Sequence, residues 1–387
     1  MQRIPPFRTL DALRGFAAVW VVMVHSCDRF LGANNLALVH QPLYAFAIRG
    51  QLGVIFFFII SGYCITAAAH SALYSGKSLN RYALERGRRI FPPYWIALLL
   101  GVLIQVLLSF AESHHWIAKI NHPGTLVWTP RYWVANLTLT QSELHSDYEN
   151  VVFWSLCYEV TFYAIVGLWL WVSQRVARSR GMASGQLTLI LGLAGTTYAT
   201  LLVLIIFAIP VFPFDLWHQF ALGGLLFYVL EARDETVAGY SRRFRLMLNG
   251  VAGVAIVLSV AFAVLRQLGG SDIGHPSSSV RTLVALLLCL FLAGIRRFDA
   301  RIAKSGWMRP LLWLGAASYS LYLVHPLVLP FIDVTCRRAG LDGGRYWIAF
   351  WIQVVVAVGF GRLFYQLIER HCISSQQVKR LREEHVG

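Results

Sequence analysis

The sequence predicts an all-α fold, a polytopic membrane bundle of about ten transmembrane helices. Of its 387 residues, 57% are hydrophobic and only 14% are charged, and the mean hydropathy is +0.57. Such a chain is too apolar for a soluble globular domain. Apolar runs, most of them long enough to span a bilayer, recur along the chain: Leu10–Cys27, Leu43–Ala69, Ile90–Phe110, Val151–Val172, Leu187–Ile209, Phe214–Leu230, Leu246–Leu265, Thr282–Ile295, Leu311–Asp333 and Tyr346–Ile368.

The positions of Lys and Arg orient these spans. With the N-terminus in the cytoplasm, about 25 of the 34 basic residues fall in cytoplasmic segments, as the positive-inside rule requires. We therefore expect both termini to be cytoplasmic. The net charge of +15 follows mostly from this topology, so the sequence does not call for a nucleic-acid partner.

The chain reads as one transmembrane domain, residues 1–375, followed by a short cytoplasmic tail, residues 376–387. Asp11 and Arg14 interrupt the apolar core of the first run, so we expect no removable signal peptide there. The six cysteines are scattered and include no CxxC pair. We interpret them as apolar packing residues, with neither a disulfide framework nor a zinc site, and we expect no bound metal.

The longest connection, Ala111–Asn150, is placed outside the membrane and is rich in Trp, Tyr and His. Loops of this length are commonly functional or mobile. Its composition suits a carbohydrate-facing surface, but aromatic residues at the membrane interface would give the same pattern. Its histidines lack an ordered metal-ligand spacing.

The first run carries a cation and a proton carrier on one face. Arg14 and His25 are eleven residues apart, about three helical turns, so both side chains point the same way about 16 Å apart along the axis. Ionisable groups at bilayer depth are costly and usually line a functional path. We therefore expect Arg14 to face the cytoplasm and His25 to lie towards the outer side of one buried passage.

Two further motifs lie in the second apolar run and just before the third. In FFFIISGYC, Ser61 and Gly62 interrupt an apolar run; small residues there allow close helix packing, or else leave room for a thin ligand chain. In RYALERGRRIFPPYW, Arg86 and Arg89 belong to an arginine group just before two prolines. These arginines either anchor the cytoplasmic side or form a phosphate site held by a rigid turn.

The fourth run opens with FWSLCYEVTFY and places Trp154, Ser155 and Glu159 near the outer side. Ser155 and Glu159 are four residues apart and share a helix face. A carboxylate inside a span needs a partner, and His25 lies at the same outer level. A His–carboxylate pair would make His25 a general base; the alternative is a buried hydrogen bond that joins two helices.

The ninth run, WLGAASYSLYLVHPLVL, places Ser318, Tyr322 and His325 on one face by their i, i+4, i+7 spacing. Pro326 lacks a backbone donor and so leaves the carbonyl of Tyr322 free. His325 is either a site residue or a histidine satisfied within the core.

Five motifs in this order resemble the acyltransferase family 3 membrane proteins, the integral inner-membrane O-acyltransferases that modify bacterial surface polysaccharides and some secreted small molecules. They are LDALRGFAAVWVVMVH, FFFIISGY, RGRRIFPPYW, FWSLCYEVTFY and SYSLYLVHP, and the resemblance covers nearly the whole chain. It implies a multi-pass protein of the bacterial inner (cytoplasmic) membrane. Some members carry an additional hydrolase-like domain; since the sequence ends after the tenth predicted span, we expect none here.

The resemblance also implies a mechanism. Acetyl-coenzyme A, or another acyl-coenzyme A, is expected as a co-substrate, with no permanently bound cofactor. Its phosphates would dock on Arg14, Arg86 and Arg89, and its arm would pass Ser61. His25, supported by Glu159, would take the proton from an acceptor hydroxyl; alternatively His25 or Ser155 would carry the acyl group briefly. Trp154, Tyr322 and His325 would contact the acceptor.

The predicted function is thus transfer of an acyl group, expected to be acetyl, from cytoplasmic acyl-coenzyme A to a sugar hydroxyl of a cell-surface or exported glycan. Partners are the acyl donor, a glycan or lipid-linked sugar acceptor and membrane lipid. A proton-coupled secondary transporter is the alternative, because buried His, Glu and Arg suit it too; no internal repeat supports it. A succinyl or longer acyl donor, or a macrolide-type small-molecule acceptor, also fits.

Overall fold

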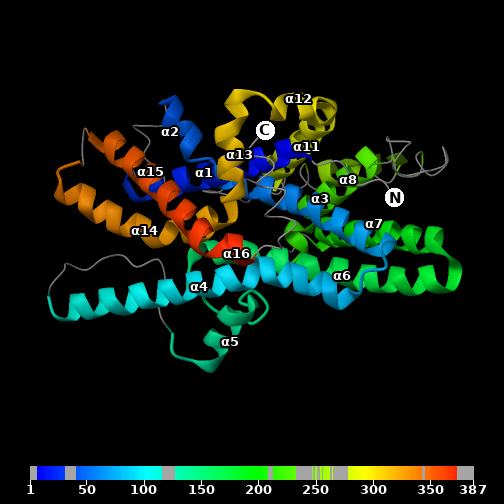
Figure 1. Cartoon of the computed structure of the whole chain (residues 1–387), viewed down its shortest axis with the longest axis horizontal. Helices are drawn as coiled ribbons and strands as arrows, with labels where there is room; N and C mark the ends of the chain where they lie inside the picture. Colours follow the sequence, from blue (N-terminus) through cyan, green and yellow to red (C-terminus); the bar gives the residue numbers. More distant parts are fainter. Residues whose placement is uncertain are drawn as a thin grey trace. The chain divides into compact units, whose positions relative to one another are not determined.

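The computed structural model describes residues 7–30, 41–115, 127–207, 212–231, 278–341 and 345–372, with scattered positions between 246 and 264. The predicted tail lies outside this part. Within it the chain is helical without any strand, which confirms the all-α class (Figure 1). Among the described residues, seven helical segments are long and apolar enough to cross a membrane: Arg8–Arg29, Pro42–Tyr74, Leu79–Ser113, Val151–Arg180, Met182–Ile206, Ser318–Arg338 and Tyr346–Cys372.

Three of the ten predicted spans are not among these seven. Phe214–Leu230 and Thr282–Ile295 correspond to α8 (Phe214–Glu231) and α11 (Ser278–Ile295), which have only 18 residues each. The third, Leu246–Leu265, lies outside the described residues except for scattered positions.

The helices form two compact units, Met1–Leu10 with Val54–Leu84 and Tyr158–Met308, and Asp11–Gly53 with Glu85–Cys157 and Arg309–Gly387. We call them the first and second unit. Three long helices contribute several residues to both, because a unit boundary falls inside each of them: α1 (Arg8–Phe30), α4 (Leu79–Ser113) and α6 (Trp154–Arg180). A fourth helix, α3 (Gly53–Tyr74), contributes only its first residue to the second unit.

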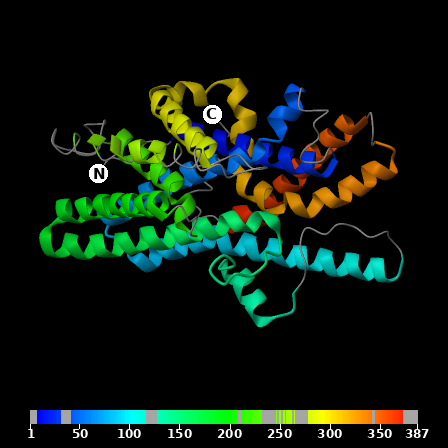
Figure 2. The ribbon, with the colours of Figure 1, turned by 180° about the vertical axis from the view of Figure 1, so that it is seen from behind.

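Besides its parts of α1, α4 and α6, the first unit contains α3 (Gly53–Tyr74), α7 (Met182–Phe207), α8, α11, η4 (Arg296–Phe298), α12 (Asp299–Ala303) and η5 (Gly306–Met308). Helix α8 lies beside α7 and beside α11 (Figure 2). Helices α3 and α8 pack backbone to backbone, since a Cβ at Gly62 would lie 1.9 Å from the carbonyl oxygen of Phe220. Gly62 therefore serves close helix packing.

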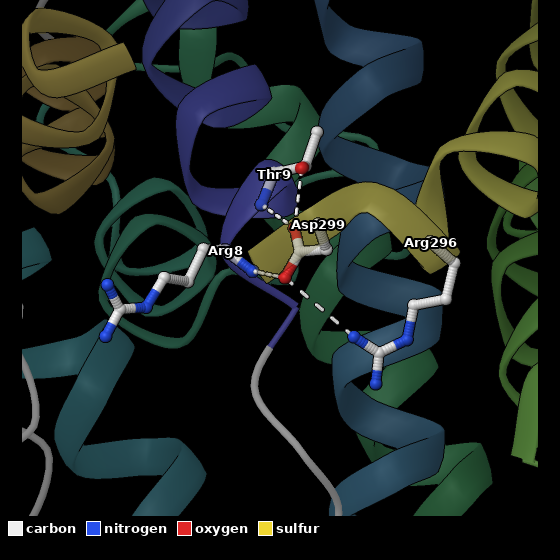
Figure 3. A network of polar contacts seen from close by, with 4 residues as sticks. All are labelled: Arg8, Thr9, Arg296 and Asp299. Carbon is white, nitrogen blue, oxygen red and sulfur yellow. Dashed lines mark hydrogen bonds and ion pairs between the residues drawn. The ribbon is translucent and has the colours of Figure 1, made fainter. Parts of the chain in front are cut away.

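A remote carboxylate caps the start of α1. The side chain of Asp299, 4% exposed, accepts hydrogen bonds from the backbone N–H groups of Arg8 (3.0 Å) and Thr9 (2.8 Å) and from the Thr9 hydroxyl (2.6 Å). Arg296 adds an ion pair at 3.8 Å (Figure 3). The first N–H groups of a helix have no partner within it, and negative charge there is favourable, so Asp299 fixes where α1 begins.

The second unit contains α2 (Pro42–Ala47), η2 (Gly50–Leu52), α5 (Pro130–Thr138), η3 (Val151–Phe153), α13 (Arg309–Ala316), α14 (Ser318–Arg338), α15 (Tyr346–Phe364), the π-helix η7 (Tyr365–Glu369) and α16 (Arg370–Cys372), with its parts of α1, α4 and α6. Helices α14 and α15, in orange and red, lie side by side in both views (Figures 1 and 2).

The ninth predicted span, Leu311–Asp333, is divided into α13 and α14 at Ala317. Helix α13 lies directly against α1, since a Cβ at Gly315 would lie 1.9 Å from the carbonyl oxygen of Asp11. The small residues of the LGAAS segment permit this approach, and the helical face expected of Tyr322 and His325 starts anew at Ser318.

Candidate active site

Two histidines meet in the second unit. The rings of His25 on α1 and His325 on α14 have centroids 5.2 Å apart and are tilted by 40°. His325 is completely buried, and its Nδ1 lies 3.1 Å from the carbonyl oxygen of Leu321. Because a carbonyl oxygen only accepts, Nδ1 carries the hydrogen and Nε2 is the acceptor. In the described part of the chain, nothing hydrogen-bonds to this buried Nε2.

A pair of hydroxyl groups adjoins the histidines. The Tyr322 and His325 rings pack edge to face with centroids 6.1 Å apart. The Tyr322 hydroxyl lies 2.7 Å from the Ser155 hydroxyl, and each lies 3.2 Å from the Val152 carbonyl oxygen, which accepts. Thus the second unit brings together four residues singled out from the sequence: His25, Ser155, Tyr322 and His325. Trp154, one position before Ser155, begins α6.

Glu159 belongs to the first unit. Its Oε1 accepts hydrogen bonds from the Ser61 hydroxyl at 3.1 Å and from the Tyr163 hydroxyl at 2.7 Å. Ser61, expected beside the acyl donor's arm, is therefore a donor to Glu159. The pairing of Glu159 with His25 stays a prediction.

The three arginines expected to bind phosphate all belong to the second unit, Arg14 on α1 and Arg86 and Arg89 on α4. Nε of Arg86 is buried, with no hydrogen-bond partner among the described groups. A further residue, Glu369, lies within electrostatic range of Arg14 and Arg89. The unit therefore holds an arginine group and, eleven residues further along α1, the histidine pair.

Three polar residues of these sites escaped the sequence reasoning. Tyr163 is four residues after Glu159, a spacing that places both on one face and could have indicated the hydrogen bond. Glu369 directly follows the tenth apolar run, and its partner Ser320 lies 49 residues away in the chain. Glu149 was counted with the long loop, and nothing in its neighbours along the chain indicates burial.

The end of the long loop is a buried polar network. Asn136 Oδ1 accepts from the Gln141 side chain at 2.9 Å and from the backbone N–H of Glu149 at 3.1 Å. The Glu149 carboxylate, completely buried, accepts from Gln105 of α4 at 3.3 Å. Burial raises the pKa of Glu149 to about 8. This network is followed at once by η3, whose Val152 carbonyl holds the hydroxyl pair.

Comparison with known proteins points to one family. The family described as an acyltransferase domain matches residues 7–365. This match confirms the resemblance inferred from the five motifs. It also confirms the prediction of an enzyme that transfers acyl groups other than amino-acyl groups.

Curated relatives agree with the family match. The chain is 23% identical over 377 residues to the peptidoglycan O-acetyltransferase OatA of Listeria monocytogenes, covering 93% of this chain and 55% of the relative. It is 23% identical over 338 residues to the O-acetyltransferase OatA of Staphylococcus aureus, covering 84% and 51%. The putative peptidoglycan O-acetyltransferase YrhL of Bacillus subtilis is 23% identical over 394 residues, covering 93% and 54%. The chain thus spans about half the length of these relatives. No solved structure matches.

Proposed function

We propose, from the premise that this chain belongs to the acyltransferase domain family, that it transfers an acetyl group from acetyl-coenzyme A in the cytoplasm to a glycan hydroxyl outside the membrane. The observation that carries the proposal is the meeting of His25, His325, Tyr322 and Ser155 in one unit. Such a set supplies a base, a group that orients it and hydroxyl donors, which acyl transfer requires.

His25 is the general base in this proposal. It takes the proton of the acceptor hydroxyl while that oxygen attacks the thioester carbonyl; the new C–O bond forms, the C–S bond breaks, and the proton passes from His25 to the departing thiolate. His325 supports it because its Nε2 is an acceptor. If His25 donates one ring N–H to this nitrogen, its other nitrogen is free to receive the proton.

The hydroxyl pair favours direct transfer over an acyl-serine relay. A nucleophilic serine needs a base within hydrogen-bond reach, whereas the described partners of the Ser155 hydroxyl are Tyr322 and a carbonyl oxygen. The pair has two hydroxyl hydrogens. The Val152 carbonyl oxygen accepts one of them, and we assign the other to the developing oxyanion. Trp154 and the outer loop then face the sugar.

The donor site follows from the arginines. Arg14, Arg86 and Arg89 would bind the phosphates of coenzyme A, since guanidinium groups offer forked donors to phosphate oxygens. Arg14 and His25 lie on one helix, about 16 Å apart along its axis, and this is the length that the pantetheine arm has to bridge. The proposed location is the bacterial inner membrane with both termini in the cytoplasm, as the positive-inside distribution favours.

The acceptor is proposed from the relatives, two of which are named for peptidoglycan. A polymer of sugar hydroxyls outside the membrane suits the aromatic residues of the outer loop. We also expect replacement of Glu159 or Ser61 to slow transfer, because Glu159 belongs to one of the five family motifs and Ser61 donates a hydrogen bond to it.

The test is acetyl transfer in membrane vesicles that contain the full chain. Vesicles are given acetyl-coenzyme A with a labelled acetyl group, and the glycan is examined by mass spectrometry for added acetyl groups. We expect label in the glycan with the native chain and none with His25→Gln. The control is His70→Gln, which replaces a buried histidine that packs against Tyr74 and Phe227 of the first unit.

Two results would overturn the proposal. Unchanged labelling with His25→Gln would remove His25 from the mechanism. Consumption of acetyl-coenzyme A that does not depend on this chain, together with proton-driven movement of a glycan precursor that does, would favour the transporter instead.

A further inference from the structure

Glu369 is a buried carboxylate at the end of the π-helix η7. Its side chain is 3% exposed. One oxygen, Oε2, accepts both hydrogen bonds that Ser320 can donate, from the backbone N–H at 3.1 Å and from the hydroxyl at 2.5 Å. Two donors on one oxygen fix the plane of the carboxylate, so its direction is set by α14.

Three other elements of the second unit place groups near this carboxylate. Arg14 of α1 and Arg89 of α4 lie within electrostatic range of it, and Ser320 belongs to α14. Tyr319, next to Ser320, donates its hydroxyl to the carbonyl oxygen of Ile90 at 2.9 Å. That bond holds the start of α14 against α4 directly beside Arg89.

The π-turn decides which way Glu369 faces. A π-turn holds one residue more than an α-turn, and one residue corresponds to about 100° around a helix. With a regular α-helix through Tyr365–Glu369, the carboxylate would point about that far away from its present direction. Single π-turns of this kind are frequent at functional sites.

The charges leave room for one more anion. Two neighbouring guanidinium groups repel each other, and a buried carboxylate without partners is unfavourable. A third guanidinium group, that of Arg362 on α15, also lies within electrostatic range of Glu369. The arginines therefore outnumber the carboxylate, and their excess positive charge attracts the phosphates of the donor.

We propose that Glu369 is a positioning residue of the acyl-donor site, which holds Arg14 and Arg89 at the spacing that receives the phosphates of coenzyme A. The proposal rests on the proposed function. It adds that Ser320 ties this site to α14, on which Tyr322 and His325 follow two and five residues later. One anchor thus fixes both the donor site and the helix that carries His325.

The test is equilibrium binding of coenzyme A, without an acetyl group, to the full chain purified in detergent. Glu369→Gln keeps the size and an oxygen that accepts from Ser320 but removes the charge, so we expect the Kd to rise about tenfold. Glu369→Asp keeps the charge and should lie between native and Glu369→Gln. Ser320→Ala removes one of the two hydrogen bonds and should raise the Kd less. The control is Asp333→Asn, which should leave the Kd unchanged. Asp333 belongs to α14, like Ser320, but its carboxylate is paired with Arg337 at 2.8 Å.

An unchanged or lower Kd with Glu369→Gln would overturn the proposal, because the carboxylate would then merely repel the phosphates. Failure of the native chain to bind coenzyme A would overturn it too. If Glu369→Gln does not fold, the other two variants decide. The proposal is overturned if Glu369→Asp and Ser320→Ala both bind coenzyme A with the Kd of the native chain. Should the native chain bind coenzyme A and respond as expected yet transfer no acetyl group, the proposed function fails while the role of Glu369 stands.

Discussion

Asp299 of the first unit and Glu369 of the second are buried to nearly the same extent, but the groups around them differ. Asp299, 4% exposed, receives three hydrogen bonds from the first turn of α1 and an ion pair from Arg296. Glu369, 3% exposed, receives two from Ser320 and stands near arginines of two other helices. The hydrogen bonds and the ion pair of Asp299 serve to cap the first turn of α1. Near Glu369, in contrast, the arginines outnumber the carboxylate, so positive charge remains.

The histidines differ in the same way. His70 of the first unit is surrounded by the rings of Tyr74, Phe227 and Tyr228, an environment for packing. His325 of the second unit lies against another histidine, with ring centroids 5.2 Å apart. Two titratable rings in contact are candidates for proton transfer, whereas a histidine among the rings of other residue types is a candidate for packing.

The largest expected effect is that of the second histidine. His325→Gln should lower the rate of acetyl transfer at least about 100-fold, because general-base catalysis contributes about 10²–10⁴ and His25 loses the acceptor that orients it. His70→Gln should leave the rate unchanged. Initial rates at saturating acetyl-coenzyme A measure this. Equal losses in both variants would erase the difference between the two histidines.

Asp299→Ala is expected to lower the free energy of unfolding by about 2 kcal/mol, since three donors at the start of α1 lose their acceptor. Its Kd for coenzyme A should stay at the native value, in contrast with Glu369→Gln. Thermal denaturation in detergent and the binding assay measure the two quantities on one preparation. A changed Kd with native stability would contradict the assignment of Asp299 as a helix cap.

Tyr322→Phe should slow transfer about tenfold, the cost of one lost hydrogen bond to developing charge, with no change in the Kd of coenzyme A. The matched control is Tyr319→Phe, which also removes a hydroxyl from α14. That hydroxyl donates to the carbonyl oxygen of Ile90 on α4, whereas the hydroxyl of Tyr322 lies 2.7 Å from that of Ser155. The ratio of the two rates is the measurement. Tyr319→Phe as slow as Tyr322→Phe would indicate that both hydroxyls only hold the helix.

The smallest expected effect concerns Glu149, a buried carboxylate with an amide partner. Its pKa of about 8 lies above the usual value of 4.5 because of burial, so the folded chain binds more protons than the unfolded chain between these values. Stability therefore falls as pH rises through this range, by about 1 kcal/mol between pH 7 and pH 8. Glu149→Gln should remove this slope in thermal denaturation at a series of pH values. A slope that persists in the variant would assign it to another group.

The sequence predicted much of the fold because the signals are local. Apolar length identifies a span, and five short motifs were enough to indicate the family. It predicted the shared direction of Arg14 and His25 because both lie on one helix of fixed period. It could not place Glu369 or Glu149, because their partners Ser320 and Gln105 lie 49 and 44 residues away in the chain.

What the sequence by itself determined is an all-helical membrane chain of the acyltransferase family, in which the helical period predicts Arg14 and His25 on one face of the first helix. Only the tertiary structure decided that His325 and Tyr322 stand beside His25 and Ser155, that α14 begins at Ser318, and that Glu369 rather than Asp299 lies among the arginines. The physical reason is that helix period and hydropathy act within a segment. The partner of a buried polar group, in contrast, is chosen by the packing of segments far apart in the chain.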